Sequence, residues 1–521
     1  MRRGVIGIAV AGMLLRLLLV VRDITVLDRL FVPDDTYYTL AIARGMARGW
    51  GPSVDGIHLT NGFQPLIAFL VVPAFWVSRD PMFPLRVAWT ILALADVASA
   101  VLLARLAMRA VPSLGTGRAI AAWAACALWS LSPVAIANAM GGLETSLAVA
   151  CELACVEVWC VAREKPSRNW WLLAGVLSGL GVLARIDSAI IFIVLAIAAG
   201  IEKPRAVAWA VLGSAVVVAP WWAYELVHFG TVIPSSGQAV RTQVAEHRAY
   251  YLTSFGQLGW ALGAALEPWV ARLADLRLFF YRQTWLTVIV APVGIFGSIF
   301  AAWRSGVIRP VLAFLVGALA LFPFYAFYVP ALWFFPRYLA PVHAALTLLV
   351  AIGLAHAFES REQWPRRWFI VRGAVLIVFA LSGAVDAGQL LAQPDRTPDE
   401  DLHGAKGYRE PAMALMRMIP PGAVIGALQS GALSYFAAPG VRVLNLDGVI
   451  DNEARIAFRD NRMADFVRAN KMTYFADWEW NREAFLRHTG DPRIAESCLV
   501  PIGGAPPQPP DRFVLYSFVC P

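Results

Sequence analysis

Two adjacent carboxylates follow the first long apolar stretch of the sequence. Asp34 and Asp35 stand in the run Val-Pro-Asp-Asp-Thr-Tyr-Tyr at residues 32–38. Apolar neighbours and mutual repulsion should raise the pKa of at least one of them. Such a carboxylate suits a general base that takes a proton from a substrate hydroxyl. The plain alternative is that one of them caps a helix expected at 35–48, which explains one carboxylate and not two.

Other polar residues that could bind a substrate stand near the ends of apolar stretches. The candidates for holding an anionic group are Arg337, Arg185, Arg241, His228 and Tyr338. The candidates for contacting a sugar are Glu144, Tyr37, Tyr38, His58, Asn61, Gln64 and Asp187. Each has a structural alternative, such as anchoring at a membrane interface for Arg337 or favouring a helix start for Glu144. Lone histidines are usually structural, so no metal ligand is assigned, and a divalent metal stays an open alternative.

The composition predicts a membrane protein. Its transmembrane helices would then hold the candidate site residues in place. Of 521 residues, 59% are hydrophobic and 15% are charged, whereas soluble proteins carry about 25% charged residues. Long apolar stretches are typical of membrane spans. They predict about eleven transmembrane helices, at 4–21, 84–110, 118–138, 145–162, 171–184, 188–201, 207–226, 284–303, 309–329, 340–358 and 369–391. The first is interpreted as a retained helix, because Arg22 and Asp23 follow it in place of a cleavage site.

The positions of the arginines and lysines predict the orientation in the membrane. A further apolar piece at 65–78 contains Pro73 and is interpreted as a helix lying on the membrane surface. Five basic clusters, together with the N-terminus, then become cytoplasmic, as the positive-inside rule requires. The clusters lie at 105–118, 163–168, 203–205, 304–309 and 361–372. The first external loop is 22–83, and all the candidate site residues fall on the external side.

The last part of the chain changes in character and predicts a second domain. Residues 1–391 form the expected membrane domain and 392–521 an external α/β domain. Short apolar runs at 423–428 and 441–446, a helical stretch at 455–470 and a last strand at 512–519 support this division. Polar turns at 429–435 and 445–449 could bind a glycan, although a purely stabilising domain is the plainer interpretation. Cys498 and Cys520 could form a disulfide, and the sequence leaves this open.

Several motifs, taken in order, resemble the GT-C class of integral membrane glycosyltransferases. The resemblance rests on the Asp-Asp pair, Ala-Arg-Gly-Met-Ala-Arg-Gly at 43–49, Thr-Asn-Gly-Phe-Gln-Pro-Leu at 60–66, Gly-Leu-Glu-Thr at 142–145, Ala-Arg-Ile-Asp at 184–187, the run at 228–236 and Phe-Pro-Arg-Tyr-Leu-Ala-Pro at 335–341. The chain looks closest to bacterial members of the mycobacterial arabinofuranosyltransferase type. Aminoarabinose transferases of lipid A and protein O-mannosyltransferases are more distant.

The resemblance implies a fold and an activity. The fold would be a GT-C-like, membrane all-α bundle in a bacterial inner membrane, with a small C-terminal periplasmic α/β domain. The donor would be a polyprenyl-phosphate sugar and the acceptor a glycan or glycolipid. Asp34 or Asp35 would act as the base, and Arg337, with Arg185 or Arg241, would hold the leaving phosphate. We expect inversion at the sugar, although residue spacing leaves retention open.

Two other classes of function compete with this interpretation. A transporter or flippase of a lipid-linked or small-molecule substrate is the first, but no corresponding repeat halves appear in the sequence. A membrane scaffold with a receptor-like tail is the second, and it predicts that Asp34, Asp35 and Arg337 are dispensable. Nucleic-acid binding is disfavoured because the basic residues are spread between apolar stretches. No phosphate-binding loop of the nucleotide-binding type is present in the sequence.

Overall fold

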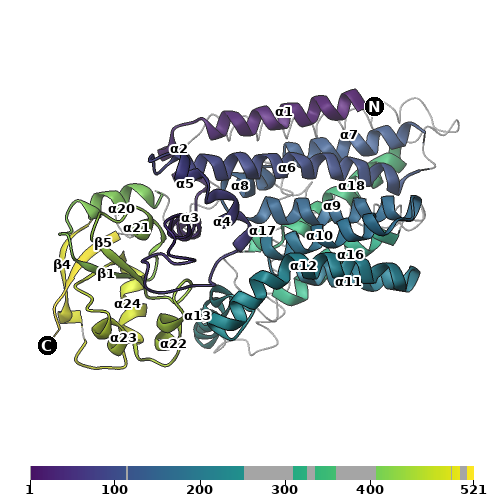
Figure 1. Cartoon of the computed structure of the whole chain (residues 1–521). Helices are drawn as coiled ribbons and strands as arrows, with labels where there is room; N and C mark the ends of the chain where they lie inside the picture. Colours follow the sequence, from purple (N-terminus) through teal and green to yellow (C-terminus); the bar gives the residue numbers. More distant parts are fainter. Residues whose placement is uncertain are drawn as a thin grey trace.

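The computed structural model describes residues 2–112, 115–251, 309–325, 335–358, 407–494, 496–504 and 513–520. It shows a bundle of long helices with a mixed α/β part packed against one end (Figure 1). The expected spans at 284–303 and 369–391, and the basic cluster at 361–372, lie outside the described residues.

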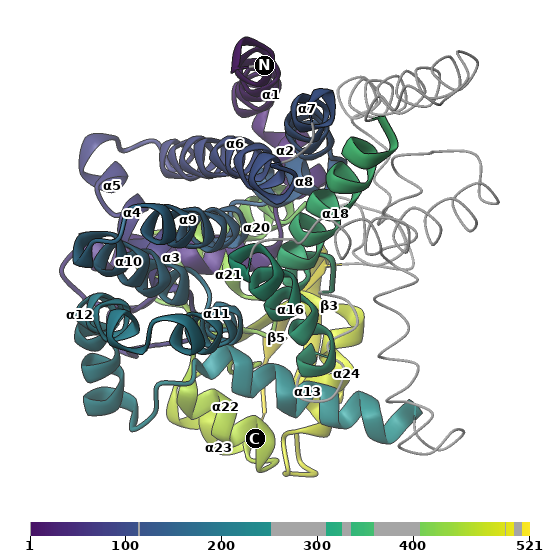
Figure 2. The same cartoon turned by 90° about the vertical axis from the view of Figure 1, so that its right-hand side faces the viewer.

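The bundle consists of helices that run side by side and are seen nearly end-on in Figure 2. They are α1 (Arg2–Val20), α6 (Phe83–Ala110), α7 (Thr116–Ser130), α8 (Pro133–Met140), α9 (Thr145–Glu164), α10 (Arg168–Ala184), α11 (Ser188–Glu202), α12 (Pro204–Phe229), α16 (Arg309–Pro323) and α18 (Ala340–Phe358). One buried core of Ala, Leu, Val and aromatic residues is shared by most of them. The expected stretch at 118–138 is broken into α7 and α8, because Ser132 caps α8 and Pro133 occupies its first turn.

Within the described part of the chain, four helices are each long and apolar enough to cross a membrane: α1, α6, α9 and α12. Helices α7 and α8 pass the same test together, with a bend of 51° between them. Helices α11, α16 and α18 are apolar but shorter. A bilayer core of about 30 Å needs about 20 helical residues, so the expected number of about eleven spans stays a prediction.

A buried ion pair holds α1 to the bundle, although most of the surface of α1 is exposed. Arg16 donates from Nε to the Asp96 carboxylate of α6 at 2.7 Å and from Nη1 to the Ser130 carbonyl at 2.9 Å. The indole of Trp129 donates to the same carboxylate at 2.9 Å. A charge inside a membrane is costly unless it is paired, and this pairing therefore fixes where α1 packs.

Short helices connect the long ones at the end that carries the α/β part (Figure 1). They are α2 (Ile24–Phe31), α3 (Asp34–Ala47), α4 (Pro65–Val71), α5 (Ala74–Val77), α13 (Ser235–Tyr251) and α17 (Phe335–Tyr338). The apolar piece expected at the membrane surface is the pair α4 and α5, broken near Pro73. Its Phe69, Leu70, Trp76 and Val77 are exposed.

The α/β part contains one five-stranded sheet in the order β2-β1-β3-β5-β4. Its elements are α20 (Arg409–Met416), β1 (Val424–Ala427), α21 (Gly431–Tyr435), β2 (Arg442–Asn445), α22 (Asn452–Arg459), α23 (Met463–Ala469), β3 (Tyr474–Trp478), α24 (Glu479–Arg487), η3 (Glu496–Cys498), β4 (Leu499–Gly504) and β5 (Phe513–Phe518). Strand β1 is parallel to β2 and β3, and β5 is antiparallel to β3 and β4.

One detail of the α/β part differs from what the sequence predicted, and another answers a question that the sequence left open. The single helix expected at 455–470 is two helices, because the chain turns at Asn461 with a φ of 53°. Cys498 and Cys520 form a disulfide, which settles the pairing that the sequence left open.

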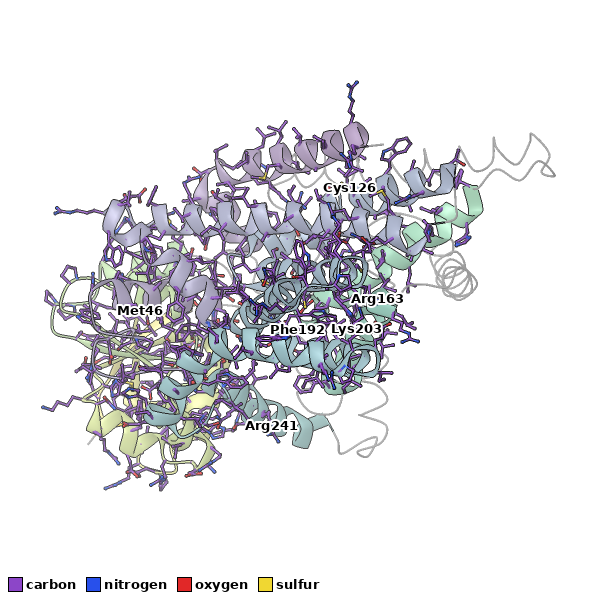
Figure 3. All side chains as sticks on the ribbon, turned by 45° about the vertical axis from the view of Figure 1, so that its right-hand side comes forward. Met46, Cys126, Arg163, Phe192, Lys203 and Arg241 are labelled. Atoms are coloured by element: carbon purple, nitrogen blue, oxygen red, sulfur yellow. A yellow bond between two sulfur atoms is a disulfide. The ribbon has the colours of Figure 1, made fainter. Side chains whose placement is uncertain are left out.

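The α/β part and the bundle share a hydrophobic core. Leu27, Tyr37 and Trp89 from the first 110 residues belong to the same buried cluster as Leu433 and Trp478. We call this end of the bundle, where residues 407–520 pack, the capped end. The opposite end, which carries Arg105, Arg109, Arg163, Glu202 and Arg309, is called the far end. Figure 3 shows Arg163 and Lys203 on the side of the bundle away from Met46 of α3.

Candidate active site at the capped end

Asp35 and Arg337 form an ion pair at the capped end. Asp35 lies in the first turn of α3 and Arg337 on α17, 302 residues later. The Nη2 of Arg337 donates to the Oδ2 of Asp35 at 3.0 Å. The side chains are 34% and 19% exposed, respectively. A pair that is partly open to solvent at a helix end can exchange its internal contact for a contact with a substrate.

A second ion cluster is buried beside this pair. Arg185 donates to the carboxylate of Glu144 at 2.8 Å and to both oxygens of Asp187, at 3.0 and 2.7 Å. The hydroxyl of Tyr325 also accepts from Arg185, at 3.0 Å, and donates to Asp187. The Arg185 side chain is only 7% exposed. Its charge is therefore neutralised within the protein by two carboxylates.

Tyr338 joins the two groups into one cluster. The guanidinium carbons of Arg185 and Arg337 lie 5.1 and 5.3 Å from the centre of its ring. Its ring also stacks on Tyr325, with centres 4.7 Å apart and planes 15° apart. Such distances allow cation–π attraction. We refer to Asp35, Glu144, Arg185, Asp187, Tyr325, Arg337 and Tyr338 as the Arg337 cluster.

The cluster contains most of the expected charged residues and adds one tyrosine. Tyr325 was not expected, because a single tyrosine in an apolar stretch carries no sequence signal. Glu152 was also missed; it lies two turns beyond Glu144 on α9 and accepts from Ser188 at 2.6 Å. Its second carboxylate oxygen is buried without a hydrogen-bond partner in the described part of the chain. An acid inside an expected membrane span was the available signal for it.

Asp34 has a different role from its neighbour. Its two carboxylate oxygens accept from the backbone N–H groups of Gly431 and Ala432, each at 2.8 Å. These groups begin helix α21 of the α/β part. Burial, opposed by these two hydrogen bonds and reinforced by the charge of Asp35, raises the pKa of Asp34 to about 7. The expected cap of the helix at 35–48 is wrong: α3 begins after Pro33 without a side-chain cap, and Asp34 caps α21 instead, almost 400 residues away in sequence.

Arg44 holds the other end of the same short helix. Its guanidinium donates to the carbonyls of Tyr435 and Ser434 at 2.6 and 2.8 Å. A carboxylate at the N-terminus and a cation at the C-terminus both stabilise a helix, since they complement its dipole. Helix α3 therefore clamps α21 at both ends and fixes the α/β part on the bundle.

Several residues expected to contact a sugar are used inside this interface. The Tyr37 hydroxyl donates to Asp28 at 2.5 Å, and the Tyr38 hydroxyl donates to the Leu428 carbonyl at 3.0 Å while accepting from Ser430 N. Both side chains are buried. Buried polar groups need such partners. These tyrosines therefore pack between α3 and its neighbours, and their expected sugar contact stays a prediction.

Residues of the first external loop also have internal partners. The Asn61 amide group donates to the Ile233 carbonyl at 3.4 Å and accepts from Ser235 N at 3.2 Å, and its side chain is buried. His58 pairs with Asp55 at 2.8 Å, and this hydrogen bond raises its pKa. Gln64 is half-buried at the start of α4. Asn61 and His58 thus organise the loop.

His228 and Arg241 make none of the contacts that define the cluster among the described residues. His228 is exposed near the end of α12, where its ring packs on Tyr224. Arg241 is exposed on α13 (Figure 3). Their selection rested on residue type near a motif, and the direction of each side chain was not predictable from sequence.

The turn at 445–449 brings one further acid toward the site. Burial raises the pKa of Asp447 to about 8, and the charges of Asp35 and Asp34 contribute to the shift. Its carboxylate accepts from Val449 N at 2.9 Å. Within the described ranges, no group of three or more His, Cys, Asp or Glu side chains is arranged to hold a metal ion.

The structure is similar to solved membrane proteins, whereas the sequence matches no protein-family model and no curated protein. The archaeal oligosaccharyltransferase AglB from Archaeoglobus fulgidus, in complex with an inhibitory peptide and a dolichol-phosphate, has a TM-score of 0.57 at 14% identity, over 95% of this chain and 72% of that chain. ArnT from Cupriavidus metallidurans bound to undecaprenyl phosphate has a TM-score of 0.57 at 15% identity, over 99% of this chain and 98% of that chain. The archaeal enzyme with Zn and sulfate has a TM-score of 0.58 at 16% identity, over 98% of this chain and 73% of that chain.

At these identities the similarity establishes the fold. The chain has the GT-C fold of these proteins, as its motifs predicted, and its apolar helices make it a membrane protein. The likeness to the arabinofuranosyltransferase type remains a prediction.

Proposed function

We propose that this protein is a glycosyltransferase that moves a sugar from a polyprenyl-phosphate donor to a hydroxyl of a glycan or glycolipid. The observation that carries the proposal is the partly exposed Asp35–Arg337 pair at one end of a bundle with the GT-C fold. Solved proteins with this fold have been obtained with dolichol-phosphate and undecaprenyl phosphate bound. The proposal extends that ligand class to this chain.

Asp35 is the better candidate for the base, and Arg337 for the phosphate contact. Asp34 is buried, and both of its oxygens accept from backbone amides of α21, so its carboxylate is not open to an acceptor hydroxyl. Asp35 is more exposed, and it pairs with Arg337, a cation that a phosphate could also bind. A bidentate arginine–phosphate contact is stronger than a single charged hydrogen bond. Donor binding would then free the Asp35 carboxylate at the moment when a base is required.

The reaction would be a single displacement at the anomeric carbon. Asp35 accepts the proton of the acceptor hydroxyl. At the same time the oxygen of that hydroxyl forms the new bond to the anomeric carbon. The bond between that carbon and the phosphate oxygen breaks, and the polyprenyl phosphate leaves with the bonding electrons. The positive charge of Arg337 stabilises the charge that develops on this phosphate. The product has inverted configuration.

Arg185, Glu144 and Asp187 are better described as positioning residues. The Arg185 guanidinium already donates to two carboxylates and a tyrosine. Its charge is therefore compensated within the protein and does not attract a phosphate strongly. Through Tyr338 this buried group supports the segment that carries Arg337. The carboxylates of Glu144 and Asp187 lie beside the Asp35–Arg337 pair and would orient the sugar of the donor.

The sidedness follows from the charges of the two ends. We place the far end, with its arginines, in the cytoplasm of a bacterium, because cytoplasmic loops carry an excess of basic residues. The capped end and the α/β part, proposed as a domain of residues 392–521, would then lie in the periplasm. The sugar, the acceptor and any requirement for a divalent metal are left open by this assignment.

The test begins with mass spectrometry of the lipid that co-purifies with the full-length protein. The matching polyprenyl-phosphate sugar is then supplied with glycan acceptors in proteoliposomes. We expect Asp35→Asn to lower transfer by about 10²–10⁴-fold, the usual contribution of a general base. Asp34→Asn should lower it less, in parallel with any loss of folded protein. Normal transfer by Asp35→Asn would refute the base, and movement of the lipid between leaflets without covalent transfer would favour a flippase.

A further inference from the structure

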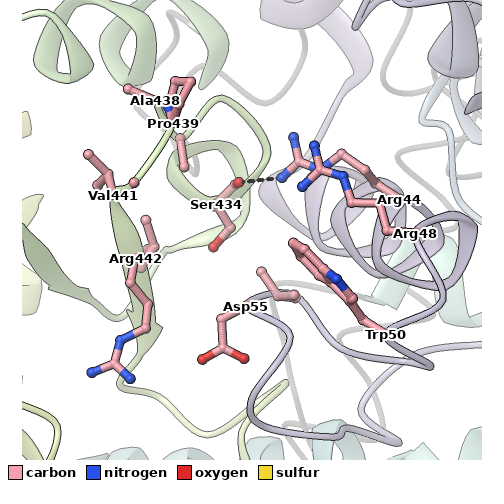
Figure 4. A pocket seen from close by; sticks show the side chains of 13 residues that line it. Arg44, Arg48, Trp50, Asp55, Ser434, Ala438, Pro439, Val441 and Arg442 are labelled. Atoms are coloured by element: carbon pink, nitrogen blue, oxygen red, sulfur yellow. Dashed lines mark hydrogen bonds between the residues drawn. The ribbon is translucent and has the colours of Figure 1, made fainter. Parts of the chain in front are cut away.

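A pocket lies at the capped end, near the last turn of α3, whereas Asp35 lies in the first turn of that helix. It has a volume of about 430 Å³ and is formed between the end of α3, the first external loop and the turn that leads into β2. Figure 4 shows Arg44 and Arg48 side by side on one wall, Trp50 and Asp55 nearby, and Pro439, Val441 and Arg442 across from them. Volumes of about 300–1,000 Å³ are typical of sites for small ligands.

The pocket has an excess of positive charge. Arg44, Arg48 and Arg442 line it, against the single acid Asp55. Burial lowers the pKa of Arg44, and the nearby charge of Arg48 lowers it further. Asp55 is occupied by His58, by the N–H groups of Ile57 and His58 and by Ser53. The one carboxylate at the wall is thus committed to its own loop and does not pair with the arginines.

Two further groups make the pocket suited to a sugar. Trp50 is 41% exposed, and the guanidinium carbon of Arg48 lies 4.9 Å from the centre of its ring. Aromatic rings offer large apolar surfaces, so the exposed part of the Trp50 ring can pack against the apolar face of a sugar. The Ser434 hydroxyl is buried without a hydrogen-bond partner among the described residues, and it lines the same pocket. Buried hydroxyls normally have hydrogen-bond partners, so a hydroxyl of a bound ligand would supply the missing partner of Ser434.

We propose that this pocket binds a sugar carrying an oxyanion, either a carboxylate or a phosphate. Arg48 would supply the cation, Trp50 an apolar contact and Ser434 the hydroxyl contact. The Arg442 guanidinium donates to the Asn470 carbonyl and would contribute only its charge. Arg44 would contribute its charge while its hydrogen bonds stay on α21. The pocket lies at the other end of α3 from Asp35, and the 13 helical residues from Asp35 to Arg48 span about 20 Å. This distance suits a more distant unit of an extended glycan acceptor, and that role, unlike the binding itself, rests on the proposed function.

The test is direct binding to the full-length protein in detergent, without donor and without turnover. The probes are galacturonic acid oligomers and glucose 1-phosphate, with the neutral maltose oligomers as reference, measured by calorimetry. We expect acidic probes to bind and neutral ones to bind at least about tenfold more weakly, because hydrogen bonds to charged groups contribute about 1.5–3 kcal/mol. Added salt should weaken the acidic probes. Equal binding of acidic and neutral probes, or none, would overturn the proposal.

Variants connect the binding to this pocket. Arg48→Gln and Trp50→Leu should each weaken the acidic probes by about tenfold, with partial recovery in Arg48→Lys and Trp50→Phe. The matched control is Arg487→Gln, which removes the same charge from an exposed position at the end of α24 and should leave binding unchanged. If Arg48→Gln and Arg487→Gln bind alike, the pocket is not the site.

Two further experiments distinguish this proposal from failure of the proposed function and from binding of a lipid headgroup. Asp35→Asn is expected to stop transfer and to bind the acidic probes as the wild type does, so failure of one proposal is distinguishable from failure of the other. Nanodiscs of phosphatidylglycerol or phosphatidylcholine test a lipid headgroup as the source of the oxyanion. If phosphatidylglycerol contacts depend on Arg48 and the soluble probes do not bind, the sugar assignment is overturned in favour of a lipid.

Discussion

The two ends of the bundle both carry arginines paired with carboxylates, yet they differ in how these pairs are buried. At the capped end, Arg185 is 7% exposed and has Glu144, Asp187 and Tyr325 around it. At the far end, Arg309 is 62% exposed and pairs with Glu202 at 3.1 Å. Arg163 pairs with the same Glu202. The far end thus has cations near solvent that share a carboxylate.

This difference follows from what covers each end. The α/β part and α3 pack over the capped end, and the group around Arg185 is buried there. In such buried surroundings electrostatic interactions become stronger and unpaired charges more costly. The far end has no such cover in the described residues, so its ion pairs contribute little to stability. We propose that the same residue types support chemistry at one end and orientation in the membrane at the other.

The largest expected effect is on stability at the capped end. Arg185→Gln would leave Glu144 and Asp187 buried without their cation, and we expect the free energy of unfolding to fall by about 3–5 kcal/mol. Thermal unfolding in detergent measures the change. The matched change at the far end, Arg163→Gln, should cost about 0–1 kcal/mol. Equal losses would mean that the two ends do not differ in burial as described.

The next largest effect is on activity with little change in stability. Arg337→Gln should lower the transfer rate by about 10²–10³-fold, as expected when one charge-stabilising donor is removed from the transition state. Arg337→Lys should keep part of the activity, because it keeps the charge but not the planar geometry. The rate is measured in proteoliposomes, with Arg309→Gln as the control. A normal rate in Arg337→Gln would remove it from the proposed phosphate site.

A pH dependence should distinguish the capped end from the far end. In the folded protein, burial raises the pKa of Asp34 to about 7 and of Asp447 to about 8, against about 4 in an unfolded chain. The folded state therefore binds more protons, and its stability should fall as pH rises from about 4 to 8. Unfolding of the wild type and of the Asp34→Asn, Asp447→Asn double variant is compared across this range. A slope that survives in the double variant would assign the effect to other groups.

The smallest effect is expected at the far end itself. Arg105 is 52% exposed and shares Glu157 with Arg109. Arg105→Gln leaves Glu157 paired, so we expect a loss below about 1 kcal/mol and unchanged transfer. Thermal unfolding and the transfer assay check both. A large loss of activity would show that the far end contributes to the reaction, contrary to its proposed role.

Much of the bundle was predictable because membrane spans are encoded locally. The stretches at 84–110 and 145–162 correspond closely to α6 and α9. The break between α7 and α8 was missed, since the apolar run continues through Leu131 and only Ser132 and Pro133 signal it. In the α/β part, β1 and β2 fall within the expected runs at 423–428 and 441–446. The turn at Asn461 was missed because a positive φ depends on the surrounding fold.

The site was predictable by residue type and not by partner. Charge and motif order selected Asp35, Glu144, Arg185, Asp187, Arg337 and Tyr338, and the structure brings them into one cluster. The same reasoning selected Tyr37, Tyr38 and Asn61, which the structure uses for packing. A polar side chain near a motif has the same appearance in sequence whether it faces a substrate or a neighbouring element.

Asp34 and Asp35 show what the local sequence determines and what the tertiary structure determines. That two carboxylates stand at the start of a helix beyond the first span follows from the order of residues alone, because helix caps and apolar periods are local. Which carboxylate caps α21 and which meets Arg337 depends on contacts nearly 400 and about 300 residues away. Successive helical residues point about 100° apart, so adjacent acids enter different environments, and only the packing of distant elements assigns each one its partner.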